Sequence, residues 1–187
     1  MSSNRRTVLQ AALGTSLGLL LPEISRAQDS DPRNARPQTG DRLVYADGDK
    51  KNTPINLDAL PVGGPPVTAM PQDAASGTVR DGSRLNQILL VRLDPSRLQA
   101  DTQPRAAQGV VAYSAVCTHA GCDGFAWTGE KQTFKCPCHD SEFDPADAAK
   151  IIGGPATRRL PALPLKTSDG LLIVAGNFTS RVGVISN

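Results

Sequence analysis

Histidine and cysteine are scarce in this chain, which has two of the first and four of the second among 187 residues. Aromatic residues make up only 4% of the sequence. Heptad repeats, long polar repeats and a concentrated basic segment are absent. Proline and glycine are plentiful by contrast, with 15 and 17 residues. This composition favours one small, loop-rich β domain over a helical bundle.

An excess of charge of one sign is also missing. The formal net charge is +2, but three arginines and one glutamate in the first 27 residues account for it. Residues 28–187 contain 17 basic and 17 acidic side chains. Proteins that bind nucleic acid through bulk charge carry a large positive excess, so binding of that kind is not expected here.

The longest apolar run is too short to span a membrane. It covers 14 residues, Val8–Leu21, and polar residues and glycines interrupt it, whereas a spanning helix needs about 20. Arg5 and Arg6 precede the run, and the sequence SRA at 25–27 has the small-x-small form of a cleavage site. We therefore interpret residues 1–27 as an export signal.

The arginine pair within NRRTVLQ resembles a twin-arginine signal, and an ordinary secretory signal is the alternative. Export predicts a periplasmic location. If the apolar segment is retained, it would also associate the protein with the inner membrane. Residues 28–39 have no apolar face and predict a flexible linker.

The pattern of apolar runs and turn residues over 40–187 predicts one all-β domain. Aliphatic or β-branched runs bounded by turn residues predict strands at 41–47, 86–93, 109–116 and 132–137. A further hairpin is expected over residues 162–176, with the sequence SDG at its turn. Short strands with such turns favour an antiparallel sandwich or barrel.

Three intervening segments give weaker signals. Residues 66–70 lie in a segment rich in proline and glycine, and predict an edge strand. Residues 74–83 predict an exposed loop. The polar segment 94–108 predicts a loop that contains a helical turn.

All thiols and imidazoles of the protein lie in two short stretches, CTHAGC at 117–122 and CPCHDS at 136–141. In the first stretch a histidine follows the first cysteine by two residues, and in the second stretch by three. Two thiolates and two imidazoles can hold either zinc or an iron–sulfur cluster. Zinc fingers usually keep their cysteines in one knuckle and their histidines in another, so the split observed here favours the cluster.

These stretches resemble the two boxes of the Rieske iron–sulfur family, C-x-H-x-G-C and C-x-C-H-x-x. The sequence GGPATRRLP at 153–161 is similar to the proline loop of that family, and the resemblance covers about residues 109–176. It implies a Rieske-type antiparallel β-sandwich or barrel over residues 40–187. It also implies a small cluster-binding subdomain at about 115–161 and one [2Fe-2S] cluster.

The resemblance assigns a role to each residue of the site. It implies that Cys117 and Cys136 bind a buried iron, and that His119 and His139 bind an exposed one. It further implies a disulfide between Cys122 and Cys138, a bond that an exported protein can keep.

Four further residues lie around these ligands. Ser141 matches a serine that donates to a bridging sulfide. Phe143 stands where members of high potential have tyrosine, which implies a lower potential. Gly154 and Pro155 belong to the proline loop.

The function implied is an electron-transfer subunit of an exported respiratory oxidoreductase, rather than an enzyme that acts alone. With all six cysteines and histidines assigned, no free thiol and imidazole remain for nucleophilic catalysis. Nor are there two further histidines for the mononuclear iron of a Rieske oxygenase.

Disulfide-containing relatives that the chain resembles are the small subunit of arsenite oxidase and the iron–sulfur subunit of ubiquinol–cytochrome c reductase. The expected partners are a catalytic or quinol-oxidising subunit and, as acceptor, a c-type cytochrome. A zinc-stabilised interaction module is the alternative from a different class.

Overall fold

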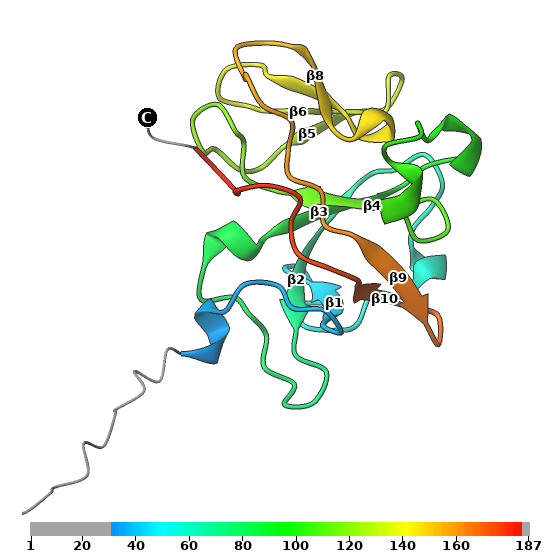
Figure 1. Cartoon of the computed structure of the whole chain (residues 1–187), viewed down its shortest axis with the longest axis vertical. Coiled ribbons are helices and arrows are strands. Elements are labelled where there is room, and N and C mark those ends of the chain that lie inside the picture. Colours follow the sequence, from blue (N-terminus) through cyan, green and yellow to red (C-terminus); the bar gives the residue numbers. More distant parts are fainter. Residues whose placement is uncertain (1–30, 185–187) are drawn as a thin grey trace, which may run out of the picture.

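The computed structural model describes residues 31–184, so the predicted export signal at 1–27 lies outside the described residues. Within residues 31–184 the chain forms two antiparallel β-sheets and no α-helix (Figure 1). The all-β fold class predicted from the sequence is confirmed. In this part of the chain, no helix has the length and hydropathy needed to cross a membrane.

Six strands form the base sheet, in the spatial order β4-β3-β2-β1-β10-β9. Four shorter strands form the small sheet, in the order β5-β6-β7-β8. The base strands are Arg42–Tyr45 (β1), Val67–Gln72 (β2), Ile88–Arg92 (β3), Val110–Ser114 (β4), Leu165–Ser168 (β9) and Leu171–Val174 (β10). The small-sheet strands are Ala126–Thr128 (β5), Thr133–Lys135 (β6), Glu142–Asp144 (β7) and Lys150–Gly153 (β8).

Single 3-10 turns lie between the strands and before β1. They are Pro32–Asn34, Leu57–Ala59, Arg84–Asn86, Pro95–Arg97, Gln103–Arg105 and Pro145–Asp147. Five of them begin after an Asp, Asn or Ser whose side chain accepts a hydrogen bond from the backbone of the turn. Such a side chain satisfies a backbone donor that a short turn leaves free.

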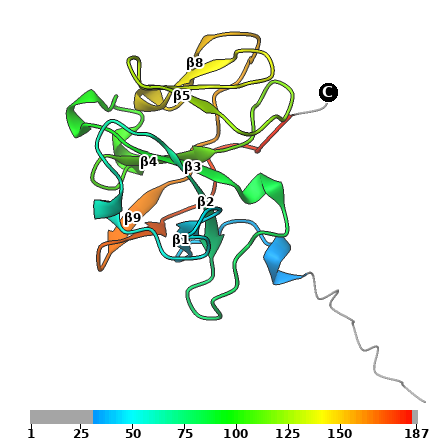
Figure 2. The same cartoon turned by 180° about the vertical axis from the view of Figure 1, so that it is seen from behind.

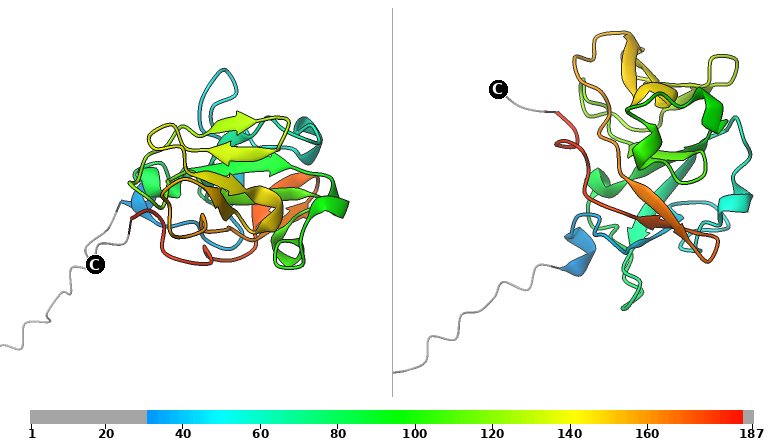
Figure 3. Two further views of the ribbon diagram at one scale, coloured as in Figure 1. Left: turned by 90° about the horizontal axis from the view of Figure 1, so that it is seen from above. Right: turned by 45° about the vertical axis from the view of Figure 1, so that its right-hand side comes forward.

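Strands β3 and β4 are apolar over residues 88–91 and 110–113 because both of their faces are covered there, and they end in Arg92 and Ser114. Leu89 and Val91 pack in a core shared with the small sheet, whereas Ile88 and Leu90 pack in the interior of the base sheet. Figures 2 and 3 show the small sheet lying over these strands. A strand covered on both faces needs apolar side chains at every position, which explains its strong sequence signal.

The base sheet curls until its two edge strands approach. The amide of Ser114 in β4 donates to the carbonyl of Pro161 (2.9 Å), and the amide of Leu163 donates to the carbonyl of Ala112 (2.9 Å). The segment before β9 therefore continues the hydrogen bonding of β4. This closure confirms the predicted sandwich or barrel.

Most predicted strands are confirmed. The segments 41–47, 86–93, 109–116 and 132–137 contain β1, β3, β4 and β6, and the predicted hairpin is β9–β10. Asp169 and Gly170 form its two-residue turn with φ of 51° and 77°. Positive φ at both positions is what this type of hairpin requires.

The prediction of an edge strand at 66–70 is wrong, because β2 lies inside the base sheet between β1 and β3. Its pairing with β3 ends at Ala69, so the missing amide hydrogen of Pro71 removes no bond to that neighbour. On its other side Pro71 pairs with Leu43 of β1.

The loop at 74–83 has the predicted exposed tip, but Arg80 within it is buried, with 6% of its surface exposed. Its guanidinium binds both carboxylate oxygens of Asp41, at 2.7 and 3.0 Å, and one oxygen of Asp73 at 3.1 Å. The hydrogen bond to Asp41 raises the pKa of Arg80 above its ordinary value. This ion network joins the start of β1 to the loop that follows β2.

The segment 31–39, which is part of the predicted linker, packs against the same loop. Arg80 donates to the carbonyl of Pro32 (3.4 Å), and the side-chain amide of Asn86 donates to the carbonyl of Ala35 (2.8 Å). Pro37 is buried. The described part of the linker is thus attached to the base sheet at several points.

We expect Arg80→Ala to lower the free energy of unfolding by about 3–5 kcal/mol, because it leaves the buried Asp41 carboxylate without its partner. The matched control is Arg33→Ala. It removes a 2.7 Å salt bridge to Asp81 in which the arginine side chain is 55% exposed. Exposed pairs contribute about 0–1 kcal/mol. Urea unfolding compares the two variants, and equal losses would contradict a structural role for the Arg80 network.

Candidate metal centre

The two ligand loops lie at the same end of one β-hairpin. The first loop, residues 117–122, precedes β5, and the second, residues 136–141, follows β6. These strands pair with Ala126 opposite Lys135. The outer ends of an antiparallel hairpin are adjacent, so the pairing of β5 with β6 brings the loops together.

Both loops share one pattern of backbone hydrogen bonds. The amide of Gly121 donates to the carbonyl of Cys117 (3.0 Å), and the amide of Asp140 donates to that of Cys136 (3.1 Å). The amide of each of these cysteines donates to the carbonyl five residues later, at 2.7 and 2.8 Å. Gly121 and Asp140 both have positive φ, 77° and 57°. Each loop is therefore a tight turn closed on its first cysteine.

Cys117 and Cys136, the predicted sulfur ligands, are free thiols with 0% and 1% of their surface exposed. Burial raises the pKa of the Cys117 thiol; the His119 amide lowers it, whereas the neighbouring Cys136 thiol raises it. Two thiols from separate loops are thus brought together in the apolar core beneath the site.

His119 and His139, the predicted nitrogen ligands, lie edge to face with ring centroids 4.7 Å apart and an angle of 85° between the rings. His119 is half-buried and His139 is exposed. The imidazoles therefore lie nearer the solvent than the thiols do. The binding of a buried iron by sulfur and of an exposed iron by nitrogen stays a prediction.

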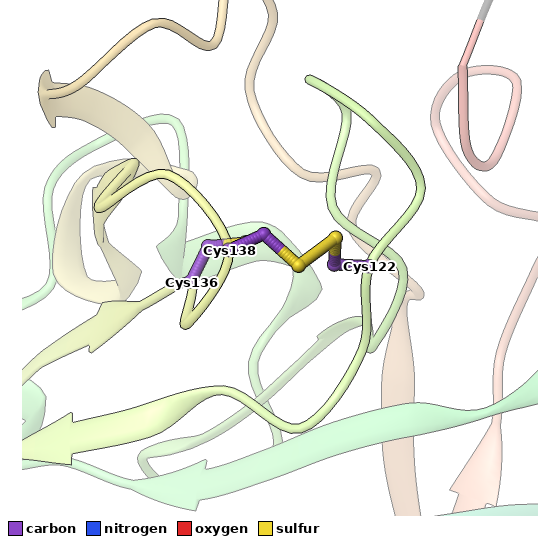
Figure 4. A group of neighbouring side chains, drawn as sticks. All are labelled: Cys122, Cys136 and Cys138. Carbon is purple, nitrogen blue, oxygen red and sulfur yellow. A yellow bond between two sulfur atoms is a disulfide. The ribbon is translucent and has the colours of Figure 1, made fainter.

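Cys122 and Cys138 form the predicted disulfide, which joins the two loops (Figure 4). The bonded residues are 16 positions apart, and closing a loop of this length contributes about 3 kcal/mol in the chain-entropy model. The sulfur atoms of Cys122, Cys138 and Cys136 all lie within 4.8 Å of one another. The disulfide therefore lies directly beside one predicted ligand.

The predicted proline loop, residues 153–161, passes close to the second ligand loop. Gly154 has a φ of 78°, and a Cβ there would lie 2.5 Å from the Cα of Ser141 and 2.6 Å from the carbonyl oxygen of Asp140. Glycine is therefore required for this approach. Pro155 follows it at the surface.

Ser141 is fully buried behind this approach. Its hydroxyl oxygen accepts a hydrogen bond from the amide of Ala156 (3.1 Å). A hydroxyl group has one proton to donate as well, and no acceptor for it is found among residues 31–184. That proton is available to an acceptor in the site, which is the role that the resemblance implied.

Sequence reasoning missed two residues that fix the first loop. The Thr118 hydroxyl donates to the carbonyl of Arg158 in the proline loop (2.6 Å). The guanidinium of Arg84 donates to the carbonyl of Gly121 (2.6 Å). The place of Thr118 between two ligands was a usable signal. Nothing in the sequence near Arg84 connects it with a loop 37 positions away.

Phe143 is fully buried in β7 and belongs to an aromatic cluster. Its ring lies edge to face with that of Phe125, with centroids 5.8 Å apart, and it pairs across the strands with Phe134. This cluster forms part of the core beneath the ligand loops.

The donor set fits an iron–sulfur cluster. The two loops place two free thiols beside each other and two imidazoles beside each other, and the other two cysteines are withdrawn as a cystine. A hydroxyl proton is available beside the buried half of the site. Thiolates and imidazoles are the ligands of Rieske clusters. An all-β domain with this site defines a cluster-binding protein of the electron-transfer type.

Comparison with known proteins agrees with this class. The family model of the Rieske [2Fe-2S] domain matches residues 71–164. A Haloferax mediterranei protein, provisionally named as the Rieske subunit of a respiratory nitrate reductase, is 38% identical over 149 residues, which are 79% of this chain and 63% of that protein.

The Rieske iron–sulfur subunit of the Streptomyces lividans cytochrome bc1 complex is 38% identical over 98 residues, which are 51% of this chain and 58% of that subunit. Among solved structures, the soluble domain of Rieske protein II from Sulfolobus acidocaldarius covers 51% of this chain and 66% of its own, with 19% identity and a TM-score of 0.38.

The chain belongs to the Rieske family, whose domain binds a [2Fe-2S] cluster. It spans 63% and 58% of the lengths of the two relatives named above. The alternative of a zinc-stabilised module is set aside by this membership.

We expect Gly154→Ala to destabilise the protein by at least about 1–3 kcal/mol, the cost of forcing a non-glycine residue into this backbone conformation. The clash with Ser141 adds to that cost, so cluster content should fall as well. The matched control is Gly153→Ala, because a Cβ there meets only Glu142 at an ordinary 3.7 Å. Visible absorbance and urea unfolding measure both effects, and equal behaviour of the two variants would contradict the close approach.

Proposed function

We propose that the protein is the electron-transfer subunit of an exported respiratory oxidoreductase, and that it passes single electrons towards a c-type cytochrome. The observation that carries this proposal is the order of the donors, with thiols inside and imidazole edges at the surface. When bound, the cluster supplies a one-electron couple, with potentials of about −150 to +300 mV when two ligands are imidazoles.

The protein's own residues provide three conditions for such a relay. The buried thiols and the apolar core beneath them keep water from the inner half of the site. The disulfide and the proline loop hold the two ligand loops in place. The exposed edge of His139 gives a short path to a partner.

The relatives support membership of a respiratory complex, and two kinds of electron donor are candidates. The Haloferax relative, whose name places it in a nitrate reductase, aligns with 149 residues, more than the span of the Rieske family model. This longer alignment favours a catalytic subunit as the donor. The second candidate is a quinol-oxidising cytochrome bc-type complex, which the bc1 relatives favour. The periplasmic location, with an association with the inner membrane, rests on the sequence of residues 1–27.

Stopped-flow mixing of the reduced, cluster-loaded protein with oxidised cytochrome c tests the relay. We expect one haem reduced per chain, and no reduction by the cluster-free variant Cys117→Ser. Failure of the wild-type protein to reduce the haem would contradict the proposal. Metal and haem analysis of the complex purified from its host then separates the donors, because molybdenum indicates a catalytic partner and b-type haem a quinol-oxidising one.

We expect Phe143→Tyr to raise the reduction potential, because a hydroxyl near the cluster would donate to it and stabilise the more negative, reduced state. One such hydrogen bond is a modest effect, on the order of 1 kcal/mol. Phe178→Tyr is the matched control, since Phe178 packs against the base-sheet core. Redox titration of the three proteins measures the shift, and an unchanged potential in Phe143→Tyr would contradict the assigned role.

A further inference from the structure

Four arginines lie on or beside the C-terminal segment near the first ligand loop, and we call them the arginine surface: Arg36, Arg84, Arg158 and Arg181. Arg158 donates to the carbonyls of Arg181 (3.2 Å) and Gly183 (2.6 Å). A Cβ on Gly121 would lie 3.4 Å from the guanidinium of Arg84 and 3.5 Å from the side chain of Val184. Figure 1 shows this segment, in red, approaching the ligand end of the molecule.

Arg36 joins the same surface through Leu85. Its guanidinium donates to the Leu85 carbonyl (3.0 Å), and the Leu85 side chain would lie 3.5 Å from a Cβ on Gly183. Arg36 and Arg181 also line one open cavity of about 260 Å³, together with the apolar residues Pro37, Phe178 and Val182. Charge and apolar contact area are therefore available side by side.

No carboxylate among residues 31–184 lies within 4 Å of any guanidinium of the arginine surface. The hydrogen bonds recorded for Arg84 and Arg158 go to backbone carbonyls, which leave the positive charge uncompensated. Asp123, the exposed carboxylate next to the first ligand loop, forms no salt bridge with them in this part of the chain.

The small sheet, by contrast, carries mainly carboxylates, and only half of those in residues 123–153 have a lysine partner. Lysines lie within 4 Å of three of its carboxylates, in the pairs Lys131–Glu142 (3.6 Å), Lys135–Asp140 (3.0 Å) and Lys150–Asp147 (3.6 Å). Residues 123–153 contain six carboxylates and three lysines, so this side keeps a net charge of −3, whereas the arginine surface is positive. A positive field beside the half-buried His119 would attract an anionic partner to the end of the molecule through which electrons leave.

We propose that the arginine surface docks the redox partner, and that this partner is a protein with a cluster of carboxylates around its exposed cofactor edge. The inference rests on the proposed electron-transfer function and adds the chemistry of the surface that the partner presents. A protein is favoured over anionic lipid because Arg84 and Arg158 both hydrogen-bond with the loop that carries His119, where a redox partner must come close.

Two small oxidants of opposite charge test the sign of the field. The reduced, cluster-loaded protein is mixed with hexacyanoferrate(III), an anion, or with tris(phenanthroline)cobalt(III), a cation, at low and high salt. In either case the cluster loses one electron and the metal complex gains it. The ratio of the two rate constants cancels any change in the potential of the cluster.

In the double variant Arg36→Gln/Arg181→Gln we expect the anion-to-cation ratio at low salt to fall by roughly tenfold. High salt should remove most of the difference. The matched control, Arg42→Gln/Lys166→Gln, removes the same charge from base-sheet strands β1 and β9, and should leave the ratio within about twofold of the wild type. An equal ratio in both double variants would overturn the proposal. Failure of the wild type to react with either oxidant would instead overturn the electron-transfer function itself.

A protein probe tests the class of partner. Cytochrome c is basic, and succinylation of its lysines gives an acidic protein with the same haem. We expect the acidic form to be reduced faster at low salt, and expect Arg36→Gln/Arg181→Gln to reverse or abolish that preference. Faster reduction of the basic form by the wild type would contradict the proposal. Binding of the wild type, but not of the double variant, to phosphatidylglycerol vesicles would also contradict the proposal, because the arginine surface would then bind lipid.

Discussion

Everything in the site depends on holding two loops, separated by a hairpin, in one place. Pairing of β5 with β6 brings the loops to the same end, and the Cys122–Cys138 disulfide joins them covalently. Without that constraint, the thiols of Cys117 and Cys136 would belong to two independent turns. The strands of the small sheet have only three or four residues, so the covalent link adds a constraint to the packing of Phe134 and Phe143 beneath the loops.

The base sheet supplies the rigidity that the small sheet lacks. Strands β3 and β4 are covered on both faces, and β4 leads directly into the first ligand loop. The proline loop then returns along β4, where Ser114 donates to Pro161. The first ligand loop and the proline loop are thus attached to the same strand. The contact between Thr118 and Arg158 joins them again at the site.

The sequence predicts features that repeat a local rule, and misses those that depend on distant partners. The apolar runs of β3 and β4, the Asp169–Gly170 turn and the two ligand stretches are local signals. Strands β5, β7 and β8 have three or four residues with mixed polarity, so only their pairing defines them. Strand β2 can lie inside the sheet although it contains Pro71, because its pairing with β3 ends at Ala69. Arg80 is buried because it pairs with Asp41, which lies 39 positions earlier.

Residues 31–39 add a constraint on the other side of the domain. These residues pack against the base sheet through Arg80 and Asn86, and Figures 1 and 2 show this segment at the end away from the small sheet. A domain held from its N-terminal side therefore presents its ligand loops outward. The ion pair of Arg80 with Asp41 is buried at the contact between this segment and the base sheet, so the same arginine fixes both the segment and the start of β1.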